Sequence, residues 1–389
     1  MSERLRILAL EPYYGGSHRA VLDGLVSRID ADWTLLTLPA RKWKWRMRGA
    51  AITMAQQARR LATVHATAES AANRGGARGL AGPPPFDVVF ASTFVNLAEF
   101  RGLAGPALAK VPAIVYFHEN QLVYPNRHTA EWDFQFPLTN ITSALSAECC
   151  VFNTAWNRDR FCEEIPGFLR EFPDHHPKGV AEAISAKSVV VAPPFDPGVF
   201  DATPVSRDTA PRIIWPHRWE HDKDPDTFFS AVAKLAAEGL DFEVAVAGQA
   251  FRDVPDSLLA AEAELGSRLV HMGEPASRAD YAALLARSDV AVSTAINEFF
   301  GIAMVESAYA GCFPLVPDRL AYPELYPAEM RYAGPDQLVA RLRSLVLDPP
   351  APGAARDLAS RFTFEVLVGE YDSVLRAVAD GAPVATESE

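Results

Sequence analysis

Short apolar runs alternate with longer amphipathic stretches along most of the chain. Runs rich in Val, Ile, Leu and Phe are typical of buried parallel strands, and the stretches between them have helical periodicity. The predicted strands lie at residues 5–10, 33–38, 88–91, 113–117, 148–152, 188–192, 212–215, 242–247, 269–272, 290–294 and 313–316. Strands that alternate with helices in both halves predict an α/β fold made of two Rossmann-like domains.

A proline-rich segment, 193–197, separates the two halves and stiffens the chain between them. We expect an N-terminal domain at 1–195, a C-terminal domain at 196–362, and a last segment at 363–389 that forms an amphipathic helix and a disordered tail. The first domain carries a basic insertion near 41–82, in which an Ala-rich helix at 50–72 leads into a mobile Gly/Pro loop at 75–85.

The composition limits the class of protein. A chain of 389 residues, 49% of them hydrophobic, is long enough for two domains with full cores. No apolar run reaches 18 residues, and the first residues lead directly into a strand, so we expect neither a membrane span nor a signal peptide. The cysteines, which lack the spacing of a metal site, predict a reduced, cytoplasmic protein without a metal; they are Cys149, Cys150, Cys162 and Cys312.

Two glutamates in the segment 297–307 bracket a turn of aromatic residues and glycine. The segment follows a predicted strand and opens a helix expected at 302–310, which ends at Gly311. Free N–H groups and the positive dipole end of such a helix suit a diphosphate. The residues expected to bind a sugar nucleotide are Glu298, Phe299, Phe300, Gly301, Ile302 and Glu306. Alternatively, the glutamates are surface charges of an ordinary strand and helix.

Arg218 and Lys223 lie on a loop that follows the strand predicted at 212–215. A loop can fold both side chains toward one anion, so the pair is a candidate for binding phosphate. The alternative is a pair of solvated charges. Gly248, directly after the strand at 242–247, is a further candidate on the same ligand side.

Two loops of the first half carry further candidates, because ligands of open α/β sheets bind beyond the carboxyl ends of the strands. The paired glycines after the first strand allow close approach of the backbone to a ligand, and Ser17 is placed to cap the helix that follows. His118 could bind a sugar hydroxyl or an acceptor, unless it is a packed structural histidine. The candidates are Gly15 and Gly16 for the donor, and Ser17, His18, His118, Glu119 and Asn120 for the acceptor.

The net charge of −12 opposes nucleic-acid binding, but it is unevenly distributed. A basic run at 41–48 interleaves cations with two tryptophans, which offers both phosphate contacts and stacking surfaces. Its candidate contacts are Arg41, Lys42, Trp43, Lys44, Trp45, Arg46 and Arg48. The alternative is a solvated helix with its tryptophans packed into the domain.

In this order along the chain, the glycine pair, the histidine, the Arg and Lys pair and the spaced glutamates resemble the retaining glycosyltransferases of the GT-B fold. The resemblance covers nearly the whole chain. It implies two Rossmann-like domains that face each other across a cleft, with the sugar nucleotide held mainly by the C-terminal domain.

Four segments of the first half are similar to the tRNA-queuosine α-mannosyltransferases, namely 13–18, 91–97, 116–125 and 140–145. That subfamily moves mannose from GDP-mannose to the cyclopentenediol of queuosine in tRNA. The similarity implies GDP-mannose as the donor, tRNA carrying queuosine as the partner, and no cofactor or metal.

The resemblance also implies roles for single residues. Arg218 and Lys223 would neutralise the diphosphate of the donor and stabilise the departing nucleotide. Glu298 would hold the donor sugar with help from the backbone of 299–302, and Glu306 would hold the ribose. His118 would touch the donor sugar or the acceptor. The expected catalytic residues are therefore His118, Arg218, Lys223 and Glu298.

Two other functions are compatible with the same residues. One is a GT-B transferase that uses another sugar nucleotide, such as a UDP-sugar, on a lipid or small glycan, although the basic run lacks the aliphatic face of an interfacial helix. The other is an RNA-binding module that has lost its activity, although the presence of both glutamates and of the Arg and Lys pair argues against it.

Overall fold

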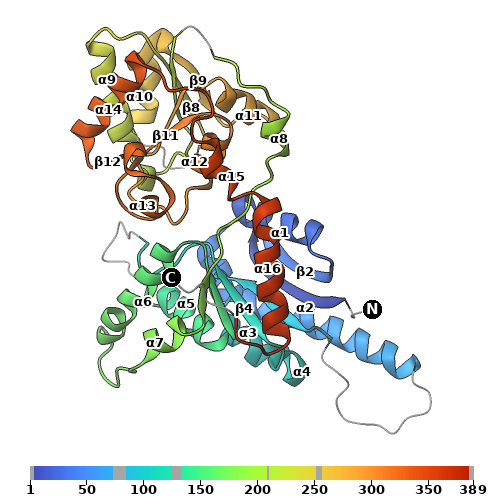
Figure 1. Ribbon diagram of the computed structural model, residues 1–389. Helices are drawn as coiled ribbons and strands as arrows, with labels where there is room; N and C mark the ends of the chain where they lie inside the picture. The colour runs from blue at the N-terminus through green and yellow to red at the C-terminus, as the bar shows by residue number, and fades with distance from the viewer. Residues whose placement is uncertain (1–3, 73–84, 125–132, 208–209, 251–255, 385–389) are drawn as a thin grey trace. The chain divides into compact units, whose positions relative to one another are not determined.

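The computed structural model describes residues 4–72, 85–124, 133–207, 210–250 and 256–384 (Figure 1), and we describe no side chains for 65–72. The chain forms two compact units. Unit 1 comprises Met1–Pro193 and Leu367–Glu389, and unit 2 comprises Pro194–Val366. Most of the mobile loop expected at 75–85, and residue 125 of the segment 116–125, lie outside the described residues.

Unit 1 is built on a six-stranded parallel sheet with the order β2-β1-β3-β4-β5-β6. Its strands are β1 (Leu5–Tyr14), β2 (Ala31–Pro39), β3 (Val88–Ser92), β4 (Ala113–Phe117), β5 (Cys149–Phe152) and β6 (Ser188–Val190). The central strands β3 and β4 are buried along their whole length, because helices cover both faces of the sheet. Since all strands are parallel, their carboxyl ends meet at one edge, where ligands bind in such sheets.

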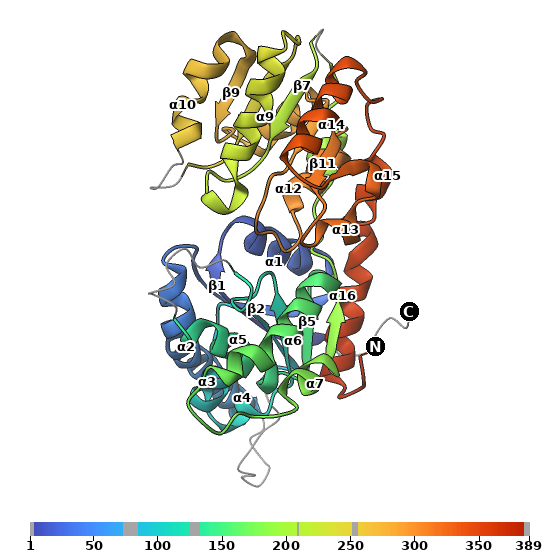
Figure 2. The same ribbon diagram turned by 90° about the vertical axis from the view of Figure 1, so that its left-hand side faces the viewer.

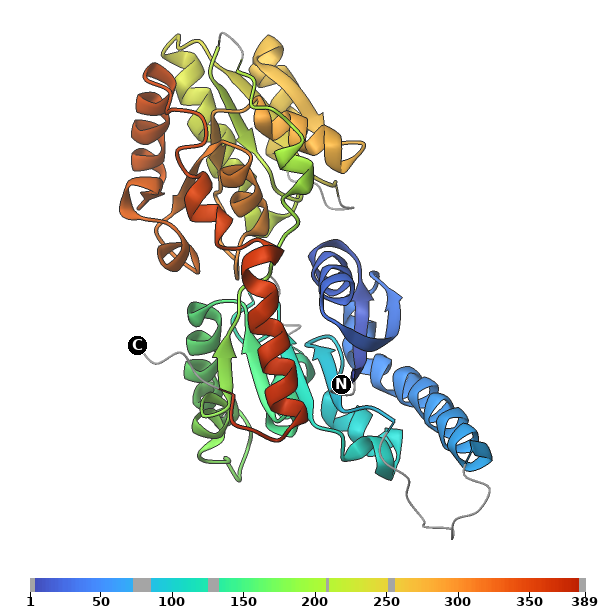
Figure 3. The ribbon, with the colours of Figure 1, turned by 45° about the vertical axis from the view of Figure 1, so that its right-hand side comes forward.

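The helices of unit 1 lie on both faces of this sheet (Figure 2). They are α1 (Gly16–Arg28), α2 (Trp43–Ala72), α3 (Leu97–Ala104), α4 (Pro106–Ala109), α5 (Gln135–Ser146), α6 (Ala155–Arg170) and α7 (Val180–Ser185). The last helix, α16 (Phe364–Ala379), lies against the strands (Figure 3). Its Tyr371 hydroxyl is 3.0 Å from both the hydroxyl of Tyr116 and the carbonyl oxygen of Ala192. These buried contacts attach α16 to the carboxyl ends of β4 and β6.

Unit 2 repeats the design with a six-stranded parallel sheet in the order β12-β11-β10-β7-β8-β9. Its strands are β7 (Arg212–Trp215), β8 (Glu243–Ala247), β9 (Leu269–Gly273), β10 (Val290–Val292), β11 (Phe313–Pro317) and β12 (Arg331–Tyr332). Its helices are α8 (Gly198–Asp201), α9 (Pro225–Ala237), α10 (Asp256–Leu265), α11 (Arg278–Ala286), α12 (Ile302–Tyr309), α13 (Tyr322–Leu325), α14 (Pro335–Leu347) and α15 (Arg356–Ser360), with 3-10 turns η2 (His221–Lys223), η3 (Gly266–Arg268) and η4 (Ala328–Met330).

The two-domain α/β fold expected from the sequence is confirmed, and each predicted strand is present. The ends of some strands differ. β1 continues past residue 10 to Tyr14, with an irregular register between Glu11 and Tyr14. β10 ends at Val292, and the short strand β12 was missed because two residues carry no periodic signal. The extension of β1 has a functional consequence, since it places Glu11 inside the sheet rather than on a loop.

Candidate active site

In unit 2, a loop connects the end of β10 to the start of α12. Gly301 precedes the helix with a φ of 84°, and a Cβ at this position would lie only 3.0 Å from the ring of Tyr322. Any other residue would therefore be both strained and crowded here. The Phe299 and Phe300 side chains are buried, so only the backbone of this turn is available to a ligand. The loop thus presents main-chain groups and Glu298.

Lys223 is buried against this loop. Its Nζ donates to the carbonyl of Asn297 at 2.8 Å and lies 3.2 Å from Glu298 Oε2 and 3.1 Å from Asp222 Oδ2. Burial favours the neutral amine, but Glu298 and Asp222 outweigh it and raise the pKa of Lys223. Conversely, burial opposes ionisation of Glu298, but the positive charge of Lys223 lowers its pKa. The structure therefore brings two predicted donor residues into one ion pair.

Arg218 lies apart from this buried pair, with an exposed side chain 3.3 Å from Glu220 Oε2. Its positive charge disfavours protonation of Lys223, so the two cations repel each other. Gly248 holds the neighbouring loop close: a Cβ there would lie 1.8 Å from the carbonyl oxygen of His217. Gly248 therefore lets its own loop lie close to the loop that carries His217, which explains on structural grounds why a glycine stands here.

Glu306 lies in α12, as the sequence predicted, and the structure shows that it is buried. Its carboxylate makes a two-point ion pair with Arg278 of α11, with N–O distances of 2.7 and 3.2 Å. Burial opposes the charged form of Arg278, but Glu306 raises the pKa of the guanidinium. A ligand hydroxyl at Glu306 would therefore have to share or replace Arg278.

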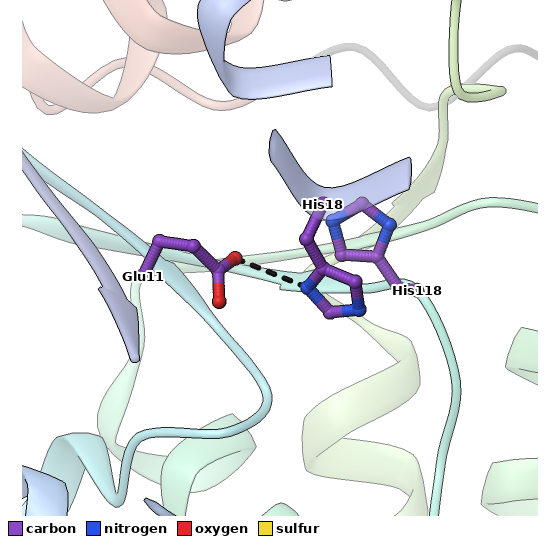
Figure 4. A group of neighbouring side chains, drawn as sticks. All are labelled: Glu11, His18 and His118. Carbon is purple, nitrogen blue, oxygen red and sulfur yellow. Dashed lines mark hydrogen bonds and ion pairs between the residues drawn. The ribbon is translucent and has the colours of Figure 1, made fainter. Parts of the chain in front are cut away.

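In unit 1, four predicted or neighbouring polar residues gather where β1, α1 and β4 meet. Glu11 Oε2 is 3.1 Å from His18 Nδ1, and His18 Nε2 is 3.7 Å from Glu119 Oε2. The ring of His118 stacks on that of His18 with a centroid distance of 3.8 Å (Figure 4). The sequence predicted His18, His118 and Glu119 as candidates, and the structure places them together.

The two stacked histidines have opposite protonation tendencies. Burial favours neutral His18, but Glu11 and then Glu119 outweigh it and raise its pKa to about 10. For His118, burial and then the positive charge of His18 both act in the same direction and lower the pKa well below its usual value. At neutral pH the pair is thus one imidazolium and one neutral imidazole.

Glu11, His18 and His118 place three possible metal-ligand atoms within 4.8 Å of one another. The stacked rings, at an interplanar angle of 30°, direct their lone pairs along nearly parallel planes rather than toward one point. His18 Nδ1 is also already engaged by Glu11. This arrangement suits an ion pair better than a metal ion.

Asn120, another acceptor candidate, is fully buried and has a structural role. Its amide nitrogen donates to Asn157 at 2.7 Å, and its oxygen accepts from the N–H groups of Leu122 and Val123. It therefore shapes the loop after β4.

Ser17 is an exposed residue inside the first turn of α1, whose N-cap is Gly15. The expectation that Ser17 caps this helix is wrong, because the helix begins at Gly16, two residues earlier than a cap at Ser17 would place it. A Cβ at Gly15 would lie 2.5 Å from Ala40 Cβ, whereas Gly16 needs its positive φ of 54°.

The basic run forms the end of a loop and the start of α2. Trp43 packs against Phe94 and Phe136, whereas the Trp45 side chain is exposed. Arg48 pairs with Asp133, and Arg46 donates to the Pro39 carbonyl at 3.2 Å. The remaining basic residues, Arg41, Lys42 and Lys44, are exposed. Trp43 is therefore packed into the domain, as the alternative interpretation predicted, and Trp45 is not.

Sequence reasoning missed several members of these clusters. Glu11 was placed on the loop after the first predicted strand and was not a candidate, and neither Asp222 nor Arg278 was one. His217 was also missed: it is buried, its Nε2 has no hydrogen-bond partner within the described part of the chain, and burial and then Lys223 lower its pKa to about 3. Position at the end of a predicted strand was the one signal that could have drawn attention to Glu11 and His217.

The model of the tRNA-queuosine alpha-mannosyltransferase N-terminal family matches residues 6–195, and that of glycosyl transferases group 1 matches residues 200–356. A tRNA-queuosine alpha-mannosyltransferase from Drosophila melanogaster is 34% identical over 384 residues, which cover 94% of this chain and 95% of that protein. The two family matches coincide with the two sheets.

Solved structures share the fold at low sequence identity. Anabaena HepE in complex with UDP has a TM-score of 0.66 and 13% identity, with coverage of 96% of this chain and 100% of that one. Sucrose-phosphate synthase from Thermosynechococcus elongatus has a TM-score of 0.65 and 13% identity, with coverage of 97% and 100%. The two-domain fold is thus that of the GT-B glycosyltransferases, and the chain belongs to the family of tRNA-queuosine alpha-mannosyltransferases.

Proposed function

We propose that this protein transfers mannose from GDP-mannose to queuosine in tRNA, with retention of the anomeric configuration. The observation that carries the proposal is the buried pair of Lys223 and Glu298, assembled beside the turn that precedes α12, in a chain of this family. Such a pair gives a cation for a leaving diphosphate and a carboxylate for sugar hydroxyls at one place.

Lys223 and Arg218 are proposed to stabilise the departing GDP. Lys223 is fixed by two carboxylates, so it supplies a positive charge with little reorganisation, and the exposed Arg218 offers a second cation for a phosphate. These cations and the N-terminus of α12 can balance the diphosphate charge without a metal. We therefore propose a metal-independent reaction.

Glu298 is proposed to accept hydrogen bonds from the mannose hydroxyls, and Glu306 from the ribose. Both carboxylates are ion-paired in the free protein, Glu298 with Lys223 and Glu306 with Arg278. Donor binding would therefore exchange part of each ion pair for sugar hydroxyls. These ion pairs hold the two carboxylates in place before the donor arrives.

The tRNA is proposed to contact the exposed part of the basic run, where Trp45 offers a stacking surface and Arg41, Lys42 and Lys44 offer phosphate contacts. The remaining members, Trp43, Arg46 and Arg48, would orient this surface through their contacts within unit 1. A cytoplasmic location is part of the same proposal, as the cysteines are free thiols. Within the described residues, no helix has the length and apolarity needed to cross a bilayer.

Incubation of the protein with GDP-mannose and tRNA tests the whole proposal. Queuosine-containing tRNA should gain the mass of one hexose on the queuosine nucleoside, and the same tRNA lacking queuosine should gain nothing. Equal labelling of both tRNAs, or no labelling of either, would overturn the acceptor assignment. UDP-glucose serves as the donor control, since HepE was solved in complex with UDP.

Thermal unfolding with nucleotides separates the donor assignment from the acceptor assignment. GDP should raise the midpoint more than UDP at equal concentration, because the ligand that binds the folded state more tightly stabilises it more. Stronger stabilisation by UDP would point to a UDP-sugar donor. Stabilisation by neither nucleotide would favour an inactive RNA-binding module.

A further inference from the structure

A small pocket lies at the carboxyl ends of β1, β3 and β4 in unit 1. Glu11, His18, Ser92 and His118 supply its polar lining, and apolar residues of β1, α1 and β3 supply the rest. Ser92 is only 3% exposed, and its hydroxyl has no hydrogen-bond partner within the described part of the chain. A buried hydroxyl of this kind is costly unless a ligand or water meets it. The pocket has room for about one water-sized polar group.

The positive charge beside this pocket is fixed on His18. Both ring nitrogens of His18 face carboxylates, with Nδ1 3.1 Å from Glu11 and Nε2 3.7 Å from Glu119. Glu11 is itself held, because its other oxygen accepts the N–H of Tyr13 at 2.8 Å. Both nitrogens must carry hydrogen to satisfy two carboxylates, so the geometry selects the imidazolium.

His118 is placed so that it cannot share this charge. Its ring stacks on the imidazolium of His18 with a centroid distance of 3.8 Å. The ring of Tyr116 contacts it edge-on with a centroid distance of 4.5 Å. The titratable groups around it are His18 from α1, Glu11 from β1, and Tyr116 and Glu119 on its own segment. Both carboxylates make their ion pairs with His18. A second proton on His118 would therefore meet a like charge at stacking distance.

We propose that His18 is a positioning residue that keeps His118 neutral, so that His118 accepts a hydrogen bond from a substrate hydroxyl seated beside Ser92. The inference rests on the proposed function, because it requires a substrate rich in hydroxyl groups. Ser92 can donate or accept, and neutral His118 offers a lone pair, so the two complement one hydroxyl group. A protonated His118 would have no lone pair to offer.

Titration of the histidine ring signals by NMR tests the free protein without any substrate. His118, assigned through the loss of its signal in His118→Gln, should show no change of protonation between about pH 5.5 and 8, whereas an ordinary histidine titrates near 6.5. His18 should remain protonated across the same range. Titration of His118 near 6.5 in the natural protein would overturn the proposal, whatever the enzyme's activity.

The pH profile of the transfer reaction then tests the link to substrate. Removal of the imidazolium in His18→Asn takes away the like charge and leaves Glu11 and Glu119 without their cation, so the pKa of His118 should rise toward its ordinary value and kcat/KM relative to the natural protein should fall from pH 8 to 5.5. Arg19→Gln, which removes an exposed cation one residue further along α1, should give a profile parallel to that of the natural protein. A parallel profile for His18→Asn as well would overturn the proposal.

The two measurements separate failure of this inference from failure of the proposed function. If the protein transfers no mannose, the NMR titration still decides whether His18 holds His118 neutral. If His18→Asn does not fold, the titration of the natural protein remains decisive. If transfer occurs and His118 titrates normally, only the inference about His18 is wrong.

Discussion

Each unit buries one cation between two carboxylates at the carboxyl edge of its sheet, and each places a neutral histidine beside it. In unit 2 the cation is Lys223, 3.1 Å from Asp222 and 3.2 Å from Glu298, with His217 as the neighbour. In unit 1 the cation is His18, and the neighbour is His118. The two units therefore share one electrostatic arrangement, made from different residues.

The difference between the two clusters lies in the cation and in the access to the neighbouring histidine. Lysine remains charged throughout the physiological range, which suits a group that must meet a diphosphate. His18 owes its charge to the fold, since a free histidine is mostly neutral at pH 7. His217 is only 5% exposed, whereas His118 is partly open to solvent. We infer that unit 2 stabilises charge and that unit 1 handles hydroxyl groups.

The largest effect is expected from Lys223→Met. Loss of the cation removes the main stabilisation of the leaving diphosphate, so kcat should fall roughly a thousandfold. Asp222 and Glu298 would also lose their buried partner, which should lower the free energy of unfolding by about 3–5 kcal/mol. Steady-state kinetics and denaturant unfolding measure the two effects. Lys234→Met, in the same unit but with a half-exposed side chain, is the matched control. It should change neither kcat nor the free energy of unfolding by much.

Glu298→Gln separates the role of the carboxylate in the unit 2 cluster from that of Lys223. The amide keeps the size of the side chain but loses the charge that holds sugar hydroxyls, so transfer should slow roughly a hundredfold. Because a neutral group replaces one of two carboxylates around Lys223, the loss of stability should be smaller than in Lys223→Met. Glu329→Gln, at an exposed position of η4, controls for the loss of one negative charge. Transfer at the natural rate by Glu298→Gln would contradict the assigned role.

The two tryptophans of the basic run separate tRNA binding from folding in unit 1. Trp45→Ala should weaken tRNA binding about tenfold without loss of stability, because an exposed indole can stack on a base. Trp43→Ala should cost about 2–3 kcal/mol of folding stability, because it packs against Phe136. Filter binding and thermal unfolding distinguish them. Unchanged tRNA affinity in Trp45→Ala would remove the basic run from the interface.

The smallest predicted effect is a difference in pH dependence of stability between the units. The folded pKa of His18, about 10, lies above its unfolded value, so its stabilising contribution is complete below about pH 6.5 and is lost as the pH rises through 10. The pKa of Lys223 is also raised, but from a higher starting value, so its contribution persists over this interval. The stability difference between the natural protein and His18→Asn should therefore shrink from pH 6.5 to 10. A constant difference would contradict the charge assigned to His18.

Local sequence patterns predicted the strands and the placement of Glu298 and Glu306, because strand ends and helix starts leave direct signals. They could not predict that Lys223 and Glu298 are buried together, since burial depends on how separate loops meet. Because burial of Lys223 is not visible in the sequence, sequence alone suggests that it can be replaced without harm to the fold. The buried ion pair with Glu298 predicts instead that its replacement lowers stability.

The basic run shows a second limit of sequence reasoning. Trp43 and Trp45 are chemically alike, but positions two apart on a helix face different directions. Their separation into one packed and one exposed side chain follows from α2 beginning at Trp43. Glu11 was missed for a related reason, because the irregularity that extends β1 is invisible in the sequence pattern.

Binding of GDP to variants of the two clusters tests the proposed division of roles most directly. In the double variant with Lys223→Met and Glu298→Gln, only Asp222 is left without its cation, so the fold should be damaged less than in Lys223→Met alone. Calorimetry should show loss of most GDP affinity in this double variant, and affinity within about twofold of the natural protein in His18→Asn, since we propose that unit 2 holds most of the nucleotide. Retention of GDP binding by the double variant, or its loss in His18→Asn, would contradict the account.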